Sequence, residues 1–265
     1  MFGRAAVSAI LGRAAERAAS PPGFWIRAGS YGLRLAENDR DREAAYRLRF
    51  LVFNLELNEG LASAYQTGRD TDEFDPVCDH LLVEHIPSGE VVGTYRVQTG
   101  CIAAGNRGYY SAREFDFAPY EPLRDQILEL GRACIHRDHR SFEVLCLLWK
   151  GLARYAGEHG ARYMIGCSSL TSQDPAEGSE MYHALREYLV RPGLQTRPIG
   201  DFGFPLAIPR GTRPTPPKLL RTYLAIGAQI CGAPAIDREF KTIDFLTLLD
   251  LERLPASIRA RFLER

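Results

Sequence analysis

The stretch ILELGRACIHRDHRSFEVLCLLWKGLARY, residues 127–155, reads as a strand, a turn and an amphipathic helix. The strand at 127–136 is apolar except for Glu129 and Arg132, and the turn HRDHRS is strongly basic. The helix carries its apolar residues at helical spacing, namely Leu145, Leu148, Trp149, Leu152 and Tyr155. Buried charges are costly unless they are paired. The two charges in the strand therefore indicate either a structural pair or a functional site.

Glu129 and Arg132 stand three positions apart, so a regular strand would direct them to opposite faces. A β-bulge at Gly131 would insert one residue and reset this alternation. Both charges would then face one cleft, and a freed backbone N–H could bind a developing oxyanion. The alternative is a structural Glu–Arg ion pair in a half-buried sheet.

The turn brings Arg137, His139 and Arg140 to the start of a helix that opens at about Ser141. Unpaired N–H groups and the helix dipole make such a start suitable for phosphate. The sequence contains neither G-x-x-x-x-G-K-[ST] nor G-x-G-x-x-G, so the common nucleotide motifs do not account for this turn. An exposed basic turn with no ligand is the alternative.

Outward from this stretch, the pattern predicts a chain of alternating strands and helices. A β-hairpin is expected from 80–86 and 91–99 around a Pro-Ser-Gly-Glu turn. Further strands are expected at 31–37, 127–136, 161–170 and 243–251, and helices at 41–57, 142–158, 175–190 and 217–230. Asp39 or Asp41 is the expected cap of the first helix, and Asp174 that of the third. We predict an α/β fold with one mixed sheet flanked by helices.

Residues 1–30 read as an amphipathic, basic leader, and 31–265 as one domain with a helical insertion near 217–231. The leader lacks the long apolar centre of a secretory signal. It is either a weak peripheral membrane contact or a frayed Ala-rich segment.

Bulk composition excludes some classes of function. Lys plus Arg and Asp plus Glu both total 33, and this balance argues against a nucleic-acid partner. The six cysteines form no C-x-x-C pair, so no zinc motif is expected, and their apolar settings are typical of a reducing compartment. We expect a cytoplasmic protein.

Three further features of the sequence are candidate functional sites. The acidic loop with Asp70, Asp72, Glu73 and Asp75 suits a cation or an amine, although a solvated turn explains it equally well. His80 opens a strand as a general base or as a hydrogen-bonded core histidine. Ser168 lies near the end of a strand, where ligand sites of α/β sheets gather, but no G-x-S-x-G elbow surrounds it.

The motifs RLRFLVF, DEFDPVCDHLLV, VVGTYRV and ELGRACIHRDHR, followed by LLWKGLARY, resemble the GNAT-fold acyltransferases. The resemblance covers about residues 31–250, and the tail APAIDREFKTIDFLTLLDL is part of it. Within this superfamily the sequence looks most similar to the ornithine N-acyltransferases of ornithine-lipid synthesis. It is also similar to the long-chain N-acyl amino acid synthases and, more distantly, to the acyl-homoserine-lactone synthases.

The resemblance implies transfer of a fatty acyl group, usually 3-hydroxylated, from the phosphopantetheine thioester of acyl carrier protein to an amino-acid α-amine. The pantetheine arm would enter a split between two parallel central strands, here 127–136 and 161–169. Its phosphate would sit at the turn formed by Arg137, His139, Arg140 and Ser141. The turn lacks the Q/R-x-x-G-x-G/A loop of enzymes that use coenzyme A, which favours the carrier protein as donor. No bound cofactor and no metal are expected.

The resemblance also implies roles for single residues. The E-x-x-R pair of the lactone synthases corresponds to Glu129 and Arg132, and their D-x-x-D pair to Asp72 and Asp75. Glu129 or His80 is the expected base, and Asp72 and Asp75 would hold the cationic end of the acceptor. Arg49 and Arg96 match arginines that the relatives use structurally or for the substrate carboxylate, and Arg132 and Arg96 would orient the acceptor carboxylate. Ser168, from its place near the strand end, is a further candidate substrate-binding residue.

Ornithine is the expected acceptor and a lyso-aminolipid the product. The alternatives are an N-acyl amino acid synthase for glycine or another amino acid, an autoinducer synthase, and a non-catalytic GNAT-fold protein that binds acyl carriers or lipids. The expected location is the cytoplasm, with peripheral contact to the inner membrane face as an option.

Overall fold

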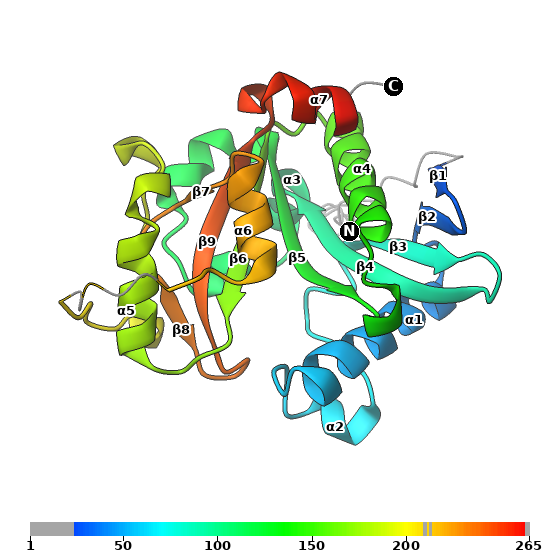
Figure 1. The fold of residues 1–265 in the computed structure, drawn as a ribbon, viewed down its shortest axis with the longest axis horizontal. Helices are drawn as coiled ribbons and strands as arrows, with labels where there is room; N and C mark the ends of the chain where they lie inside the picture. The colour runs from blue at the N-terminus through cyan, green and yellow to red at the C-terminus, as the bar shows by residue number, and fades with distance from the viewer. Residues whose placement is uncertain (1–23, 209–210, 212–213, 263–265) are drawn as a thin grey trace, which may run out of the picture.

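The structure, a computed structural model, describes residues 24–208, 211 and 214–262 (Figure 1). Most of the expected leader falls in residues 1–23, outside the described part of the chain. Residues 25–28, which we placed in the leader, instead form an edge strand of the sheet. The sheet therefore starts several residues earlier than residue 31.

The described strands form one sheet in the order β1-β2-β3-β4-β5-β6-β9-β7, with β8 also paired to β9. The strands are β1 (Trp25–Ala28), β2 (Tyr31–Leu35), β3 (Asp79–His85), β4 (Glu90–Thr99), β5 (Ile127–Ile135), β6 (Tyr163–Leu170), β7 (Gln229–Ile230), β8 (Ala235–Asp237) and β9 (Thr242–Asp250). Among them β5 and β6 run parallel, and the other pairs are antiparallel. The predicted mixed α/β sheet is confirmed.

The helices lie around this sheet (Figure 1). They are α1 (Asp39–Arg49), α2 (Ala64–Thr67), α3 (Gly100–Gly105), α4 (Phe142–Glu158), α5 (Pro175–Ala184), α6 (Lys218–Ala225) and α7 (Ala256–Phe262). A π-helical segment, η1 (Phe50–Glu56), continues α1, and short 3-10 turns such as η2 (Ser111–Arg113) and η3 (Ala118–Gln126) fill the connections. Helix α4 connects β5 to β6 and so provides the crossover that a parallel pair needs.

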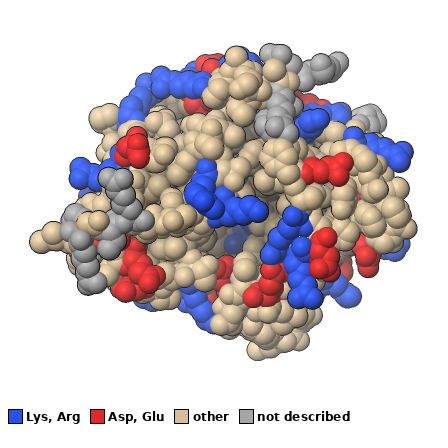
Figure 2. Space-filling model, in the orientation of Figure 1, with Lys and Arg blue, Asp and Glu red and all other residues tan. Residues whose placement is uncertain are grey.

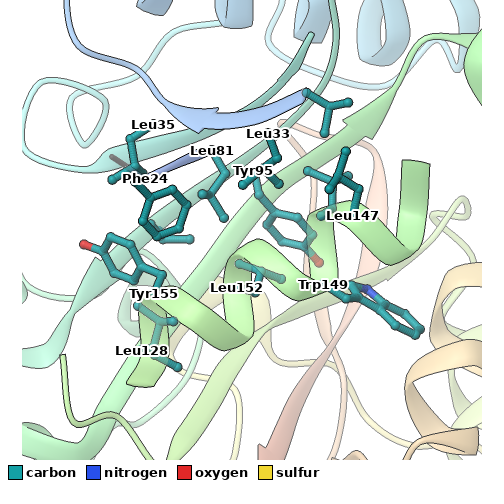
Figure 3. Packing of buried hydrophobic residues seen from close by; sticks show 14 of the residues in the cluster. Phe24, Leu33, Leu35, Leu81, Tyr95, Leu128, Leu147, Trp149, Leu152 and Tyr155 are labelled. Carbon is teal, nitrogen blue, oxygen red and sulfur yellow. The ribbon is translucent and has the colours of Figure 1, made fainter. Parts of the chain in front are cut away.

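Along each strand, successive side chains point to opposite faces of the sheet. On β3, Leu81 packs into the core beneath α4, whereas its neighbour Leu82 packs with Tyr46 of α1 on the other face. Figure 3 shows Leu147 and Leu152 of α4 among the strand residues of the larger core. This layering positions the site, because it fixes β4 and β5 between two helices.

The observed elements follow the sequence pattern closely, with informative differences. Asp174 caps α5 as expected, but the cap of α1 is Asn38, whose side chain accepts from the Asp41 N–H at 3.0 Å. Asp41 is drawn away by Arg34, which donates two hydrogen bonds to it. The helix expected at 217–230 ends at Ala225, because Gln229–Ile230 pairs with β9.

Candidate active site

The parallel strands β5 and β6 pair only at their first residues. Ile127, Leu128 and Glu129 pair with Tyr163, Met164 and Ile165, and beyond these residues the two strands are not paired. Gly166 marks the branch point, because a Cβ there would lie 2.2 Å from the carbonyl oxygen of Leu130. The predicted split between the two parallel central strands is therefore present, and a glycine is required at its apex.

A β-bulge lies on β5 just after this apex. Two residues, Arg132 and Ala133, stand opposite Tyr95 of β4, between the pairs Thr94–Cys134 and Arg96–Gly131. The predicted bulge is confirmed, but its unusual backbone belongs to Arg132, with φ +51°, and not to Gly131. Such a backbone costs a non-glycine residue roughly 1–2 kcal/mol, so neighbouring contacts must hold it in place.

A cavity of about 330 Å³ fills the split. Its lining includes the β5 segment 130–133, the β6 segment 164–169 and residues of α6. Helix α6 lies in front of β6 in the view of Figure 1. In space-filling view the same face is hollowed near its centre, between β5 and α6, with basic and acidic residues around the hollow (Figure 2).

The cavity has two chemically different ends. The apolar end is lined by side chains from β4, α4, β6, α6, β9 and the C-terminal segment, among them Tyr95, Trp149, Leu152, Met164, Tyr223, Leu249 and Leu254. The polar end is lined by Tyr110, Ser111, Arg132, Cys167, Ser168, Ser169, Asp237 and Asp244. A thioester with a long acyl chain needs this combination of an apolar channel and a polar reaction site.

Arg132 reaches the polar end of the cavity and is held there by four partners. It donates to Asp72 at 2.8 Å and lies 3.3 Å from Asp70. Its guanidinium also lies over the rings of Tyr110 and Phe240, at 4.8 Å and 4.2 Å from their centroids. These contacts explain how the strained backbone of the bulge is maintained.

Arg132 belongs to a buried network of three arginines and three aspartates, which we call the Arg–Asp network. Its other members are Arg49, Arg96, Asp70, Asp72 and Asp75, joined by ion pairs of 2.5 to 3.3 Å. Burial raises the pKa of Asp75, but Arg49 and Arg96 more than offset it and hold that pKa below its ordinary value. Three positive charges balance three negative charges, so the network is electrically neutral without a ligand.

This arrangement changes the roles that we expected for the acidic loop. Asp72 and Asp75 are buried, bound by arginines, and not among the residues that line the cavity. Arg49 and Arg96 are likewise occupied by these aspartates. We therefore no longer expect Asp72 and Asp75 to hold a cationic substrate group, because their charge is already compensated.

Glu129 does not contact Arg132, so the ion pair considered for the strand is not formed. Its carboxylate instead accepts from the side chain of Gln98 at 2.6 Å and from the backbone N–H groups of Tyr110 and Ser111 at 2.9 and 2.8 Å. Glu129 is buried and does not line the cavity, whereas Tyr110 and Ser111 do. Glu129 thus positions a segment of the cavity wall.

His80 lies in the interior beside Asp75, whose carbonyl oxygen is 3.2 Å from Nε2. Burial, together with the nearby Arg49, lowers its pKa to about 4. It does not line the cavity. The structure therefore favours the core histidine over the general base.

The basic turn after β5 is largely used in local contacts. Arg140 forms a bidentate pair with Glu56 and donates to the carbonyl oxygen of Ile135, and His139 lies 3.1 Å from the hydroxyl of Tyr31. Ser141 caps α4 by accepting from the N–H of Val144. Arg137 is largely exposed, and none of the four residues lines the cavity itself.

Sequence reasoning missed a group at the polar end of the cavity. Atoms of Glu114, Cys167 and Asp244 lie within 4.8 Å of one another, although their positions in the chain are far apart. Burial raises the pKa of Asp244 to about 6, and burial together with Asp244 raises that of Glu114 well above its ordinary value. An acidic residue inside the apolar strand IDFLTLLDL was the available signal for Asp244.

Comparison with known proteins places this geometry in a family. A model described as an acetyltransferase (GNAT) domain matches residues 48–150. The chain is also 31% identical to the L-ornithine N(alpha)-acyltransferase of Agrobacterium fabrum (strain C58), over 96% of this chain and 91% of that relative. The chain belongs to the L-ornithine N(alpha)-acyltransferase family. It is a GNAT-domain acyltransferase, as the sequence motifs predicted.

Solved structures outside the family share the fold. The AHL synthase LasI matches with a TM-score of 0.51 at 13% identity, covering 89% of this chain and 96% of its own. FeeM, an N-acyl amino acid synthase from uncultured soil microbes, matches with a TM-score of 0.50 at 13% identity, covering 88% and 95%. This chain thus has the same overall fold as these two proteins. Within the described residues, no helix is long and apolar enough to traverse a bilayer.

Proposed function

We propose that this protein transfers a fatty acyl group from the thioester of acyl carrier protein to the α-amine of ornithine, forming a lyso-aminolipid. Relatives that cover nearly the whole chain carry the name L-ornithine N(alpha)-acyltransferase. The observation that carries the proposal is the cavity in the β5–β6 split, which joins an apolar channel to a polar end at the strained bulge.

In this proposal the pantetheine arm enters the split, and the acyl chain extends along the apolar end between α4, α6 and β9. The thioester carbonyl lies against the bulge at 130–133, where a backbone N–H stabilises the oxyanion as the amine attacks. The carbon–sulfur bond then breaks as the amide bond forms, and the proton lost by the amine ends on the sulfur, so the carrier leaves with a free thiol. No covalent intermediate with the protein is required.

In this proposal, the side chains in and around the polar end have different roles. Arg132 shapes the bulged wall of the reaction site, since Asp70 and Asp72 already compensate its charge, and Ser168 lies on the β6 wall beside the reacting atoms. Glu129 acts by holding Tyr110 and Ser111 in place, since its carboxylate is occupied by three donors. Outside the cavity, Arg137 has the exposure needed to meet the phosphate of the arm, and Ser141 keeps the helix start ordered beside it.

The test is an assay with purified protein, 3-hydroxyacyl carrier protein and a panel of amino acids, in which release of the carrier thiol is measured. Ornithine should give the fastest release, and mass spectrometry should detect N-acyl ornithine. Faster release with glycine would assign the protein as a different N-acyl amino acid synthase. Absence of release across the panel, with a folded protein, would contradict the proposal.

A control assay tests whether acyl carrier protein or coenzyme A carries the acyl group. The same assay with the acyl coenzyme A of equal chain length should be slower, because the turn after β5 lacks the glycine-rich loop of enzymes that use coenzyme A. Equal rates with both thioesters would remove the carrier protein from the proposal and leave the acyl transfer to ornithine unaffected.

A further inference from the structure

Three acidic side chains stand at the polar end of the cavity: Glu114, Asp237 on β8, and Asp244 on β9. Asp237 and Asp244 line the cavity, and Glu114 lies behind them, next to a smaller cavity of about 200 Å³ that shares Tyr110 and Asp237. In the described part of the chain, no ion pair with Lys, Arg or His is formed by any of the three. The Arg–Asp network, by contrast, is fully compensated.

Two oxygen atoms of this group are buried and accept no hydrogen bond from an N–H or hydroxyl group among the described residues. They are Oδ1 of Asp244, a residue that is 5% exposed, and Oε2 of Glu114, which is 1% exposed. Asp237 differs, because its Oδ1 accepts from the N–H groups of Glu239 and Phe240. The carboxyl groups of Asp244 and Glu114 hydrogen-bond to each other, and Ser169 and Thr242 also bond to Asp244, so the group lacks a compensating cation rather than a donor.

Asp244 and Glu114 form one coupled carboxyl pair. Burial raises the pKa of both groups, and the two hydrogen-bond to each other, an arrangement that favours one shared proton. A single monovalent cation beside Asp244, on the side that lines the cavity, would compensate the negative charge that remains.

We propose that Asp244, supported by Glu114, binds the side-chain ammonium of a diamino acid acceptor and so selects ornithine over neutral amino acids. This inference rests on the proposed function and names the specificity residues of that same cavity. The α-amine is excluded as the group bound here, because an anionic partner stabilises the protonated amine, which cannot attack a thioester. The nonreacting amine has no such restriction.

A divalent metal is the competing occupant, since Glu114, Asp244 and the thiol of Cys167 lie close together. Burial raises the pKa of all three groups, so the site favours their protonated forms. A divalent cation needs its carboxylate and thiolate ligands deprotonated, so these shifts disfavour a metal at this place. A monovalent ammonium needs no such deprotonation of all three groups.

The experiment compares ornithine with norvaline, which is ornithine without the side-chain amine. For wild type, Asp244→Asn and Glu114→Gln, kcat/KM is measured for both acceptors with 3-hydroxyacyl carrier protein, and norvaline is also measured as a competitor of ornithine. Wild type should strongly prefer ornithine, and Asp244→Asn should lower that preference about 10- to 100-fold. Norvaline turnover or inhibition should fall far less than ornithine turnover, and a circular dichroism spectrum reports that the variant is folded.

Asp250→Asn is the matched control, because Asp250 lies on the same strand but pairs with Arg162 and does not line the cavity. This variant should retain the wild-type preference. Equal use of both acceptors by wild type would overturn the inference, and so would equal loss of both in Asp244→Asn, which would make Asp244 a base or a structural residue. A preference that disappears in a chelator and returns with a divalent cation would assign a metal site instead.

These outcomes are separate from failure of the proposed function, in which wild type releases no thiol with any acceptor. If wild type acylates ornithine but Asp244→Asn discriminates as well as wild type does, the function stands and only the inference falls.

Discussion

Gly166 of β6 faces Leu130 of β5 so closely that a Cβ at Gly166 would lie 2.2 Å from the Leu130 carbonyl oxygen. The contact is with backbone, so no side-chain rotation can relieve it. It lies where the pairing of the two strands ends and the cavity begins. The geometry of the split therefore depends on a residue without a side chain.

Gly166→Ala should force the two strands apart at this point. We expect a loss of about 1–3 kcal/mol in the free energy of unfolding, as for other overpacked positions, and a lower kcat/KM for the acyl donor. Urea unfolding and thiol-release kinetics measure the two effects. Gly157→Ala is the control, because nothing lies within 4 Å of the added Cβ on α4, and it should stabilise the protein by about 0.5–1 kcal/mol. A Gly166→Ala variant as stable and active as wild type would show that the apex is not tight.

The buried Arg–Asp network should respond more strongly to losing one partner than to losing a pair. Arg132→Met leaves Asp70 and Asp72 undercompensated and should cost about 3–5 kcal/mol of stability. Adding Asp72→Asn restores the charge balance and should recover part of this loss. A double-mutant cycle by urea unfolding measures the coupling between the two residues, and strictly additive losses would contradict a shared network.

Glu129→Gln tests whether Glu129 positions the wall of the cavity or acts as a base. An amide replaces one acceptor oxygen with a donor, so at least one of the three hydrogen bonds is lost, at about 1.5–3 kcal/mol. We expect lower turnover, with the acidic limb of the pH–rate profile unchanged. Loss of that limb would identify Glu129 as the base after all. Gln98→Met removes one of the same hydrogen bonds without touching the carboxylate and should give a weaker version of the effect.

Asp244 should reduce the stability of the protein at neutral pH. Its pKa is raised from 3.8 to about 6, so folding disfavours the ionised form, at up to about 3 kcal/mol. This cost is present above about pH 6 and disappears as the pH falls toward 4. Asp244→Asn should therefore have a higher Tm than wild type at pH 7.5, and the difference should shrink by pH 4.5. Taking the difference between the two proteins cancels the contribution of His80, whose lowered pKa acts in the opposite direction. A wild type more stable than the variant at pH 7.5 would contradict the predicted cost.

Local sequence patterns predicted most of the secondary structure, since periodicity and caps act over a few residues. The hairpin of β3 and β4, the strand β5 and the helix α4 lie close to their expected bounds. The edge strands β1, β7 and β8 were not expected, because two to four residues carry too little periodicity to be recognised before a partner strand is known. The bulge was predicted on β5, but its strained residue was assigned to glycine on propensity alone. In the structure, Asp70, Asp72 and two aromatic rings hold Arg132 in that conformation.

The sequence by itself determined the mixed α/β fold, the strand with its two charges and, through its motifs, the acyltransferase family. Only the tertiary structure decided which charges are partners. Glu129 and Arg132, neighbours in the sequence, bind different groups, whereas Glu114 and Asp244, 130 positions apart, share one site. The physical reason is that the cost of a buried charge depends on the groups within a few ångströms of it, and in a sheet with a crossover these groups come from distant segments.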